Sequence, residues 1–181
     1  MTAISQARIL MIATDGFEDS ELLETRKRLL GAGAAVTLAS PELKEIKGDY
    51  GGTITPDTLV DSVDEADFEG LVLPGGVANP DKLRMNAKVV EIIRAFDRAG
   101  KPIAAICHGP WLLVEADIVR GRTVTSWPSI RTDLRNAGGD VVDQAAVTDA
   151  NLVTSRKPED IPAFTDAFIK LVESADAKQP A

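Results

Sequence analysis

The fold is decided by the stretch IAAICHGP, which occupies residues Ile103–Pro110. Its first four residues, 103–106, are apolar or small and predict a short strand that is buried on both faces. The next four residues, CHGP, break that strand. The run Trp111–Ala116 then predicts a helix of about two turns. A buried strand that passes directly into a helix is typical of a sheet with helices packed on its faces.

Strands and helices alternate along the rest of the chain. Because strands that alternate with helices of ten or more residues favour parallel pairing, we expect an α/β fold with a parallel sheet and helices on both faces. We find no repeat or interdomain linker, so residues 1–181 are expected to form a single domain. The predicted strands are 8–14, 34–40, 53–55, 70–74, 103–106, 123–125, 144–148 and 151–155, and the last two are expected to form a hairpin. One predicted helix starts at Asp19 and a second lies between Gly76 and Gly100. The other predicted helices are 111–116, 130–136 and 158–173.

Composition excludes several classes of function. The 181 residues carry a formal net charge of −8, which disfavours nucleic acid or an anionic membrane as the main partner. The N-terminus resembles no secretory signal and no apolar run is long enough to span a bilayer, so a cytoplasmic location is expected. One cysteine and one histidine cannot form a Cys/His zinc cluster, and there is no P-loop or correctly placed dinucleotide fingerprint. We therefore expect no metal and no cofactor.

Cys107 is the candidate nucleophile. The string AICHG around it matches the nucleophile-elbow pattern, with Cys in place of Ser and Ala105 in place of the first Gly, and Gly109 supplies the second small neighbour. At such an elbow the sulfur would face unpaired N–H groups of the next helix, which would lower the pKa of the thiol and stabilise an oxyanion. The alternative is a buried core cysteine with no chemical role. We predict a strained, non-helical backbone at Cys107.

His108 is the only imidazole base that the chain could use. Side chains of adjacent residues usually point apart, although a sharp turn weakens that objection. An oriented histidine also needs a carboxylate or carbonyl on its other ring nitrogen, and the sequence does not show which group supplies it. The alternative is a histidine whose polar atoms are satisfied by backbone at the turn.

Several motifs together resemble the ThiJ/PfpI superfamily, which groups PfpI-type intracellular peptidases, glyoxalase- and deglycase-like stress proteins and the parkinsonism-associated deglycase. The resemblance extends over nearly the whole chain and implies a flavodoxin-like fold with a nucleophile elbow. It rests on DGFED at 15–19, LPGG at 73–76, GKP at 100–102, ICHGP at 106–110, GR at 121–122, TSWP at 125–128, and SR at 155–156 followed by Pro158 and Asp160.

The resemblance also implies roles for individual residues. It makes Cys107 the nucleophile, Glu18 the carboxyl group that hydrogen-bonds the sulfur, and Gly76 an oxyanion-hole donor. In the PfpI-like branch the histidine pairs with a glutamate of the neighbouring subunit, and the corresponding residue here is Asp81, which is one methylene shorter. We therefore expect a homo-oligomer, a dimer or larger, in which Asp81 of one subunit lies near His108 of another.

A carboxyl group beside a thiolate would have its pKa raised by repulsion and by burial, so Glu18 could donate a hydrogen bond to the sulfur. The simpler alternative is a carboxylate at the N-terminus of a helix, and that interpretation fits Asp19 better than Glu18. A substitution of Glu18 by alanine is accordingly expected to raise the pKa of Cys107.

Two functions from different classes remain. The first is a cysteine-dependent hydrolase or a glyoxalase- or deglycase-like enzyme, acting on small aldehydes, peptides or damaged proteins. The second is a redox-responsive stress protein or chaperone, whose Cys107 is oxidised and stabilised by Glu18 without turnover. A glutamine amidotransferase is excluded because it needs a histidine far downstream of the nucleophile, and none follows His108.

Overall fold

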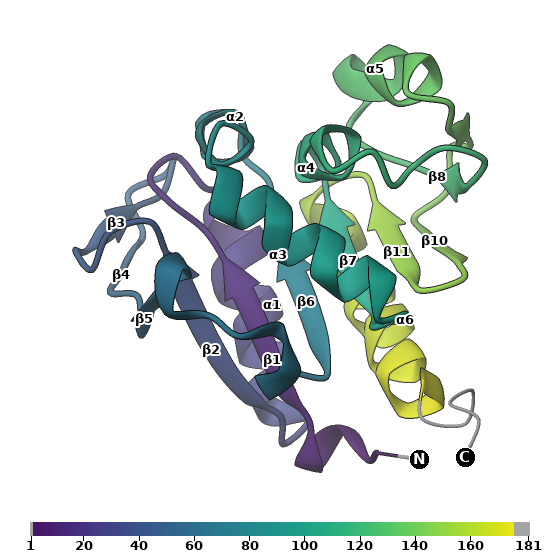
Figure 1. The fold of residues 1–181 in the computed structure, drawn as a ribbon. Helices are drawn as coiled ribbons and strands as arrows, with labels where there is room; N and C mark the ends of the chain where they lie inside the picture. The colour runs from purple at the N-terminus through teal and green to yellow at the C-terminus, as the bar shows by residue number, and fades with distance from the viewer. Residues whose placement is uncertain (1, 176–181) are drawn as a thin grey trace.

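The structure, a computed structural model, describes residues 2–175 and is built around a mostly parallel sheet (Figure 1). The strand order is β10-β11-β7-β6-β1-β2-β5, and every pairing is parallel except that of β10 with β11. The strands are β1 Arg8–Ile12, β2 Ala35–Ser40, β5 Thr58–Leu59, β6 Gly70–Leu73, β7 Ile103–Ile106, β10 Ala146–Asp149 and β11 Leu152–Ser155. Two small sheets pair β3 Ile46–Lys47 with β4 Thr53–Ile54, and β8 Thr123–Val124 with β9 Asp140–Val141.

Helices cover both faces of the sheet, which confirms the predicted fold class. In Figure 1, α3 crosses in front of the sheet, and α1 and α6 lie behind it. The short helices α2 and α4 lie at the upper end, where β6 and β7 end, and α5 lies beyond them. The bounds are α1 Asp19–Gly31, α2 Ala78–Leu83, α3 Ala87–Arg98, α4 Trp111–Glu115, α5 Arg131–Asn136 and α6 Ile161–Ala175.

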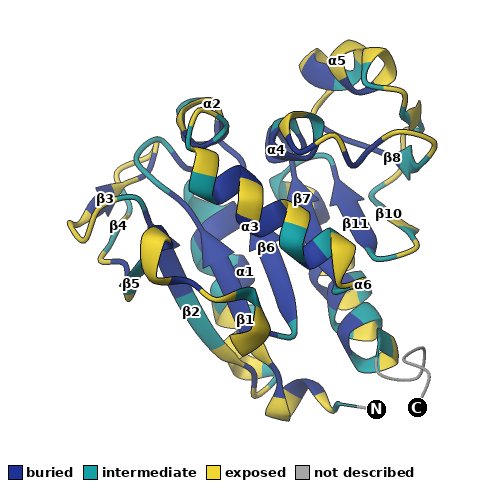
Figure 2. Cartoon of the chain, in the orientation of Figure 1, coloured by how far each residue is buried: buried dark blue, intermediate teal, exposed yellow. Residues whose placement is uncertain are grey.

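The core has two layers, one on each face of the sheet. The central strands β6 and β7 are buried along their whole length, as their short apolar runs predict, and Figure 2 shows them in dark blue. The layer beneath α3 includes Val89, Ile93 and Phe96 at helical spacing, while the layer on the opposite face includes Phe164 and Phe168 of α6. Burial on both faces fixes the strand ends rigidly, so side chains that follow β6 and β7 are held in place.

The predicted single helix between Gly76 and Gly100 is wrong, because the structure has two helices there. The break falls at 84–86, where the side chain of Asn86 accepts hydrogen bonds from the N–H groups of Lys88 and Val89 and begins α3 as its N-cap. Asparagine is among the best N-cap residues, so its local hydrogen bonds win over continuation of the first helix. Strand β9 was not expected, whereas the hairpin of β10 and β11 is confirmed.

Among residues 2–175, no helix is both long enough and apolar enough to cross a membrane.

Candidate active site

The thiol of Cys107 lies on a sharp turn directly after β7. The backbone of Cys107 has a φ of 63°, the left-handed region that residues with a side chain rarely adopt, which confirms the strained conformation that the elbow predicts. Two hydrogen bonds hold this conformation. The N–H of Cys107 donates to the carbonyl of Ser155 at 3.0 Å, and its carbonyl accepts from the N–H of Trp127 at 2.9 Å. The turn is therefore fixed by β11 on one side and by the 125–128 loop on the other.

Cys107 is only 6% exposed, and the neighbours of its sulfur shift the pKa of the thiol in opposite directions. Burial raises the pKa of the thiol, and the negative charge of Glu21 raises it further. Hydrogen bonds from the N–H groups of His108 and Gly76 act the other way, because they stabilise the thiolate. The net direction is upward, so the expected lowering of the pKa by the following helix is wrong. These donors belong to the elbow and to the loop after β6 rather than to the first turn of α4.

A second acid, Glu21, lies against the thiol. Glu21 has an exposed fraction of 0% and comes from the first turn of α1. Its Oε2 accepts the N–H of Gly75 at 2.9 Å, and its carboxyl group interacts with the Cys107 thiol. Burial, followed by repulsion from Glu18, raises the pKa of Glu21 from an ordinary 4.5 to about 8. The carboxyl group is therefore largely protonated near neutral pH, in a position to donate to the sulfur.

The structure corrects the position expected for Glu18. Its Oε2 accepts hydrogen bonds from the hydroxyl of Ser20 at 2.6 Å and from the N–H of Glu21 at 2.8 Å, so Glu18 is the N-cap of α1. The carboxylate of Asp19 instead accepts from the N–H groups of Tyr50 and Gly52 and fixes the β3–β4 loop. A capping carboxylate has its acceptor oxygen turned toward its own helix, which leaves the place beside the sulfur to Glu21 one turn later.

The sequence did contain a signal for Glu21. Residues 21, 25 and 29 share one face of α1 at spacings of four, and the structure buries Glu21, Thr25 and Leu29 together. A glutamate on the buried face of an amphipathic helix is rare unless it is paired or protonated. That placement distinguishes Glu21 from Glu18, which precedes the helix.

We expect Glu18→Gln to lower the pKa of Glu21, because repulsion from the Glu18 charge contributes to raising it. The amide oxygen of glutamine can still accept the N–H of Glu21, so most of the cap should survive. A carboxyl titration followed by infrared or NMR spectroscopy measures the shift. Ser20→Ala is the matched control, since it removes one partner of Glu18 without changing a charge. An unchanged titration of Glu21 would contradict this account of the two carboxyl groups.

Both ring nitrogens of His108 have partners within the chain. Its Nδ1 lies 3.2 Å from the sulfur of Cys107, and its Nε2 lies 3.3 Å from the hydroxyl oxygen of Ser129. The rings of Trp111 and Trp127 lie 5.2 Å and 6.1 Å from the imidazole, centroid to centroid, the first edge-on and the second stacked. Burial lowers the pKa of His108, so the ring is held neutral more readily than an exposed histidine. Side chains of neighbouring residues usually point apart, but the turn brings this thiol and imidazole together.

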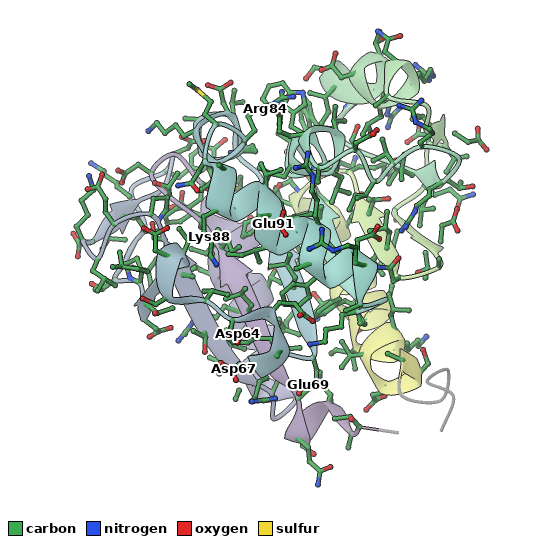
Figure 3. All side chains as sticks on the ribbon, in the orientation of Figure 1. Asp64, Asp67, Glu69, Arg84, Lys88 and Glu91 are labelled. Atoms are coloured by element: carbon green, nitrogen blue, oxygen red, sulfur yellow. The ribbon has the colours of Figure 1, made fainter. Side chains whose placement is uncertain are left out.

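Asp81 lies on α2 and is exposed. Its expected approach to His108 of a neighbouring subunit stays a prediction. Two apolar side chains near it are also exposed, Val77 by 53% and Met85 by 85%. Arg84 follows on the same segment, between α2 and α4 in Figure 3, and its guanidinium lies 5.6 Å from the Trp111 ring. The α2 segment therefore connects an exposed apolar surface with the ring that contacts His108.

A hollow of about 450 Å³ lies far from this chemistry. Glu69, Pro102 and Asn151 line it, and each precedes a strand, so it lies at the amino end of the sheet, opposite to Cys107. In the part of the chain that the structure describes, no group of three or more His, Cys, Asp and Glu side chains is placed to hold a metal ion. The candidate active site is therefore the thiol of Cys107 with Glu21, His108 and the N–H groups beside it.

Comparison with known proteins finds relatives along nearly the whole chain. The sequence model of the DJ-1/PfpI family matches residues 7–171. General stress protein 18 of Bacillus subtilis is 43% identical, over 92% of this chain and 98% of its own length. Protein/nucleic acid deglycase 2 of Escherichia coli is 42% identical, over 91% of this chain and 97% of its own length. The crystal structure of Drosophila melanogaster DJ-1beta superposes with a TM-score of 0.85 and 29% identity, covering 94% of this chain and 96% of that one.

Proposed function

Because this chain belongs to the DJ-1/PfpI family, we propose that it is a stress-response enzyme in which Cys107 attacks aldehyde or acyl carbons. The substrate class is a small 2-oxoaldehyde, a peptide or a damaged protein, and the name of the Escherichia coli relative favours deglycase-type activity. The observation that carries the proposal is the thiol at a strained elbow, 3.2 Å from an imidazole nitrogen and in contact with a buried, protonatable carboxyl group.

The contacts of the site support a simple order of steps. The thiol of Cys107 gives its proton to Nδ1 of His108, and the resulting thiolate adds to the substrate carbonyl carbon. The carbonyl oxygen becomes an oxyanion, which the N–H of Gly76 is placed to stabilise, since this N–H already points to the sulfur. The proton held by His108 then passes to the oxyanion of an aldehyde adduct or to the leaving group of an acyl substrate. No cofactor enters this sequence.

Glu21 would tune the nucleophile in this mechanism. A protonated Glu21 donates to the sulfur and favours the thiolate, whereas an ionised Glu21 repels it. Since the pKa of Glu21 is raised to about 8, the favourable form dominates near neutral pH and is lost in alkaline solution. We propose this tuning role for Glu21 in place of the one first expected of Glu18.

Turnover of 2-oxoaldehydes and small peptides by the parent and by Cys107→Ser tests the proposal. We expect at least a thousandfold loss in the serine variant, because a hydroxyl at the same position is a far weaker nucleophile without a matched base. Cys107→Ala serves as a second blank, and thermal unfolding of each variant checks that the elbow still folds. Equal turnover in the parent and both variants would refute a cysteine mechanism.

The contacts of the sulfur also favour a second function, a redox-responsive stress protein or chaperone without turnover. A sulfenic or sulfinic acid at Cys107 would accept hydrogen bonds from the Gly76 and His108 N–H groups and from protonated Glu21. Mass spectrometry of the Cys107 peptide after mild peroxide distinguishes the two functions. Defined oxidation in a protein with no turnover of any substrate tested would favour the redox function.

We also propose that the protein forms a homo-oligomer through the surface of α2. That surface combines the exposed apolar side chains of Val77 and Met85 with Asp81, which is expected to approach His108 of a neighbouring subunit. Apolar side chains of this kind are covered when they lie within a contact between subunits. The cytoplasmic location stays a prediction alongside this one.

Met85→Glu is expected to weaken self-association at least tenfold, about 1.4 kcal/mol, because it places an unpaired charge in the contact. Sedimentation velocity over a series of protein concentrations measures the change. Leu43→Glu is the matched control, since Leu43 is 57% exposed in the loop after β2. Monomers at every micromolar concentration of the parent protein would remove this interface and the shared role of Asp81.

A further inference from the structure

We propose that Ser129 is a positioning residue that sets the tautomer of His108. In this arrangement its hydroxyl, 3.3 Å from Nε2, would accept the Nε2–H of the imidazole, and Nδ1 would be left as the proton acceptor 3.2 Å from the sulfur of Cys107. The inference deepens the proposed function and rests on it, because a fixed tautomer is what a general base at this position needs. It assigns to a residue of the same chain the orientation of the imidazole, which the family resemblance assigns to Asp81 of a neighbouring subunit.

The positions of the two ring nitrogens carry the argument. Nδ1 lies 3.2 Å from the sulfur and Nε2 lies 3.3 Å from the Ser129 hydroxyl oxygen, so the imidazole bridges Cys107 and Ser129. Among residues 2–175, no carboxylate forms a hydrogen bond or ion pair with either nitrogen of His108. The serine hydroxyl is therefore the group that stands where a catalytic base normally has its orienting partner.

Aromatic side chains keep the ring from turning away from these two partners. Trp127 stacks on the imidazole at an interplanar angle of 24°, and the N–H of its own backbone donates to the carbonyl of Cys107. Trp111 contacts the ring edge-on, and its Nε1–H donates to a carboxylate oxygen of Asp133 at 2.8 Å. Hydrogen bonds hold both tryptophans in place. Rotation of the imidazole that exchanged Nδ1 and Nε2 would therefore require the two tryptophans to move.

The two partners of the ring must be considered together, because a serine hydroxyl alone can donate or accept and fits either tautomer. A neutral imidazole has one N–H, and if this were on Nδ1 it would compete with the thiol proton of Cys107 for the same space. With the proton on Nε2, Nδ1 offers its lone pair to the thiol and Ser129 accepts the N–H; because Ser129 is exposed, its own hydroxyl proton is then free to bond to water. After the thiol proton moves to Nδ1, the imidazolium donates to the thiolate and to Ser129, so the serine contact survives proton transfer.

The charged groups near the ring do not supply this selection. Glu21 reaches the sulfur rather than the imidazole, and Asp133 and Arg84 act on Trp111. Burial alone lowers the pKa of His108. Burial disfavours the charged ring, and a shift of this kind does not specify which nitrogen of the neutral ring carries the proton.

Nitrogen-15 NMR of the imidazole tests the proposal directly. The chain has one histidine, so the ring signals of uniformly labelled protein belong to His108 without further assignment. In the parent protein we expect Nε2 to be protonated and Nδ1 unprotonated in the neutral state. Ser129→Ala should reduce the ratio of this tautomer to the other by roughly 2- to 10-fold, the range that one net hydrogen bond supplies. Ser129→Thr keeps the hydroxyl and should restore the ratio.

Two controls separate tautomer selection from general disturbance. Ser126→Ala removes a hydroxyl from the same loop, one that donates to the Trp127 carbonyl and does not reach the ring, and it should leave the ratio unchanged. Asp81→Asn tests the trans carboxylate, whose effect would also depend on protein concentration. An unchanged tautomer ratio in Ser129→Ala would overturn the proposal, as would a parent protein with its neutral proton on Nδ1.

Turnover is a second measurement, and its outcome does not depend on the tautomer ratio measured by NMR. If Cys107 is a catalytic nucleophile, Ser129→Ala should lower kcat by roughly the same 2- to 10-fold, with KM little changed. A parent protein without turnover but with a tautomer ratio that depends on Ser129 would refute the proposed enzyme function and leave the positioning role intact. Turnover by the parent protein, together with an unchanged tautomer ratio in Ser129→Ala, would refute the positioning role and leave the proposed enzyme function intact.

Discussion

Glu21→Gln is expected to remove a large pH dependence from the stability of the protein. Burial and the charge of Glu18 raise the pKa of Glu21 to about 8 in the folded state, against an ordinary value of 4.5. The folded state therefore holds this proton more tightly than the unfolded state. The stabilisation is fully present below about pH 4.5 and is lost as the pH rises through about 8. The shift corresponds to roughly 4–5 kcal/mol of unfolding free energy across that window.

Glutamine has nearly the shape of protonated glutamate and does not ionise, so the variant should lack this loss. Its advantage over the parent protein should grow as the pH rises from about 4.5 to 8 and then level off. Chemical denaturation at several pH values measures the difference between the two curves. The control is Glu24→Gln in the same helix, because Glu24 is 42% exposed and pairs with Arg28. Parallel curves for the parent and Glu21→Gln would mean that Glu21 is not held protonated.

The same variant should change the thiol. Since the negative charge of Glu21 helps to raise the pKa of Cys107, Glu21→Gln should lower that pKa, and thiolate absorbance against pH will show it. The two groups are close enough to titrate as a pair in the parent protein, in two coupled steps. In Glu21→Gln a single titration step, that of the Cys107 thiol, should remain. This outcome replaces the earlier expectation for Glu18, whose carboxylate caps α1 and does not contact the sulfur.

The elbow could be predicted from sequence because its signals are local. A run of small and apolar residues ends at Cys107, small residues flank it, and a helix follows within four residues, so one conformation satisfies all three constraints. The parallel sheet follows from the alternation of strands and helices in the same way. The break before α3 was missed because it depends on the hydrogen bonds of one side chain, Asn86.

The acid beside the sulfur was harder to predict because it depends on three-dimensional placement. Glu18 and Glu21 are three residues apart, and which of them faces Cys107 is decided by where α1 begins. Helix boundaries are the least certain part of any sequence prediction, and a shift of one turn exchanges the cap for the buried position. Ser129 illustrates the same limit, because 21 residues separate it from the His108 ring that it contacts.

Gly75→Ala is expected to be strongly destabilising, because Gly75 has no space for a side chain. A Cβ there would lie 2.8 Å from both the Cβ of Cys107 and the carbonyl oxygen of Ile106, and it would also collide with the carboxylate oxygen Oε2 of Glu21. Two of these neighbours are fixed by the end of β7 and the elbow, so they cannot yield cheaply. Overpacking of a rigid core costs about 1–3 kcal/mol and more where backbone must move, and we expect about 3 kcal/mol or more here.

Gly31→Ala is the matched control for this substitution. Gly31 is the last residue of α1, and a Cβ there would meet nothing within 4 Å. Alanine should stabilise the protein at that position by about 0.5–1 kcal/mol, because it reduces the entropy of the unfolded chain and favours the helix. Urea denaturation of both variants gives the comparison, with circular dichroism to establish that each is folded. A Gly75→Ala protein as stable as the parent would show that the loop after β6 can move away from Cys107.

Gly75→Ala also tests whether the packing of this loop holds the Glu21 carboxyl group beside the thiol. The N–H of Gly75 holds the Oε2 of Glu21, so a displaced residue 75 should also release that carboxyl group from its position beside the sulfur. Gly75→Ala should therefore weaken the pH dependence of stability that Glu21 confers, in addition to lowering stability at every pH. If stability falls and the dependence on Glu21 survives intact, the strand end moves as a rigid unit with its acid. If both change together, the close approach of β6, α1 and the elbow is what keeps the thiol and the carboxyl group in contact.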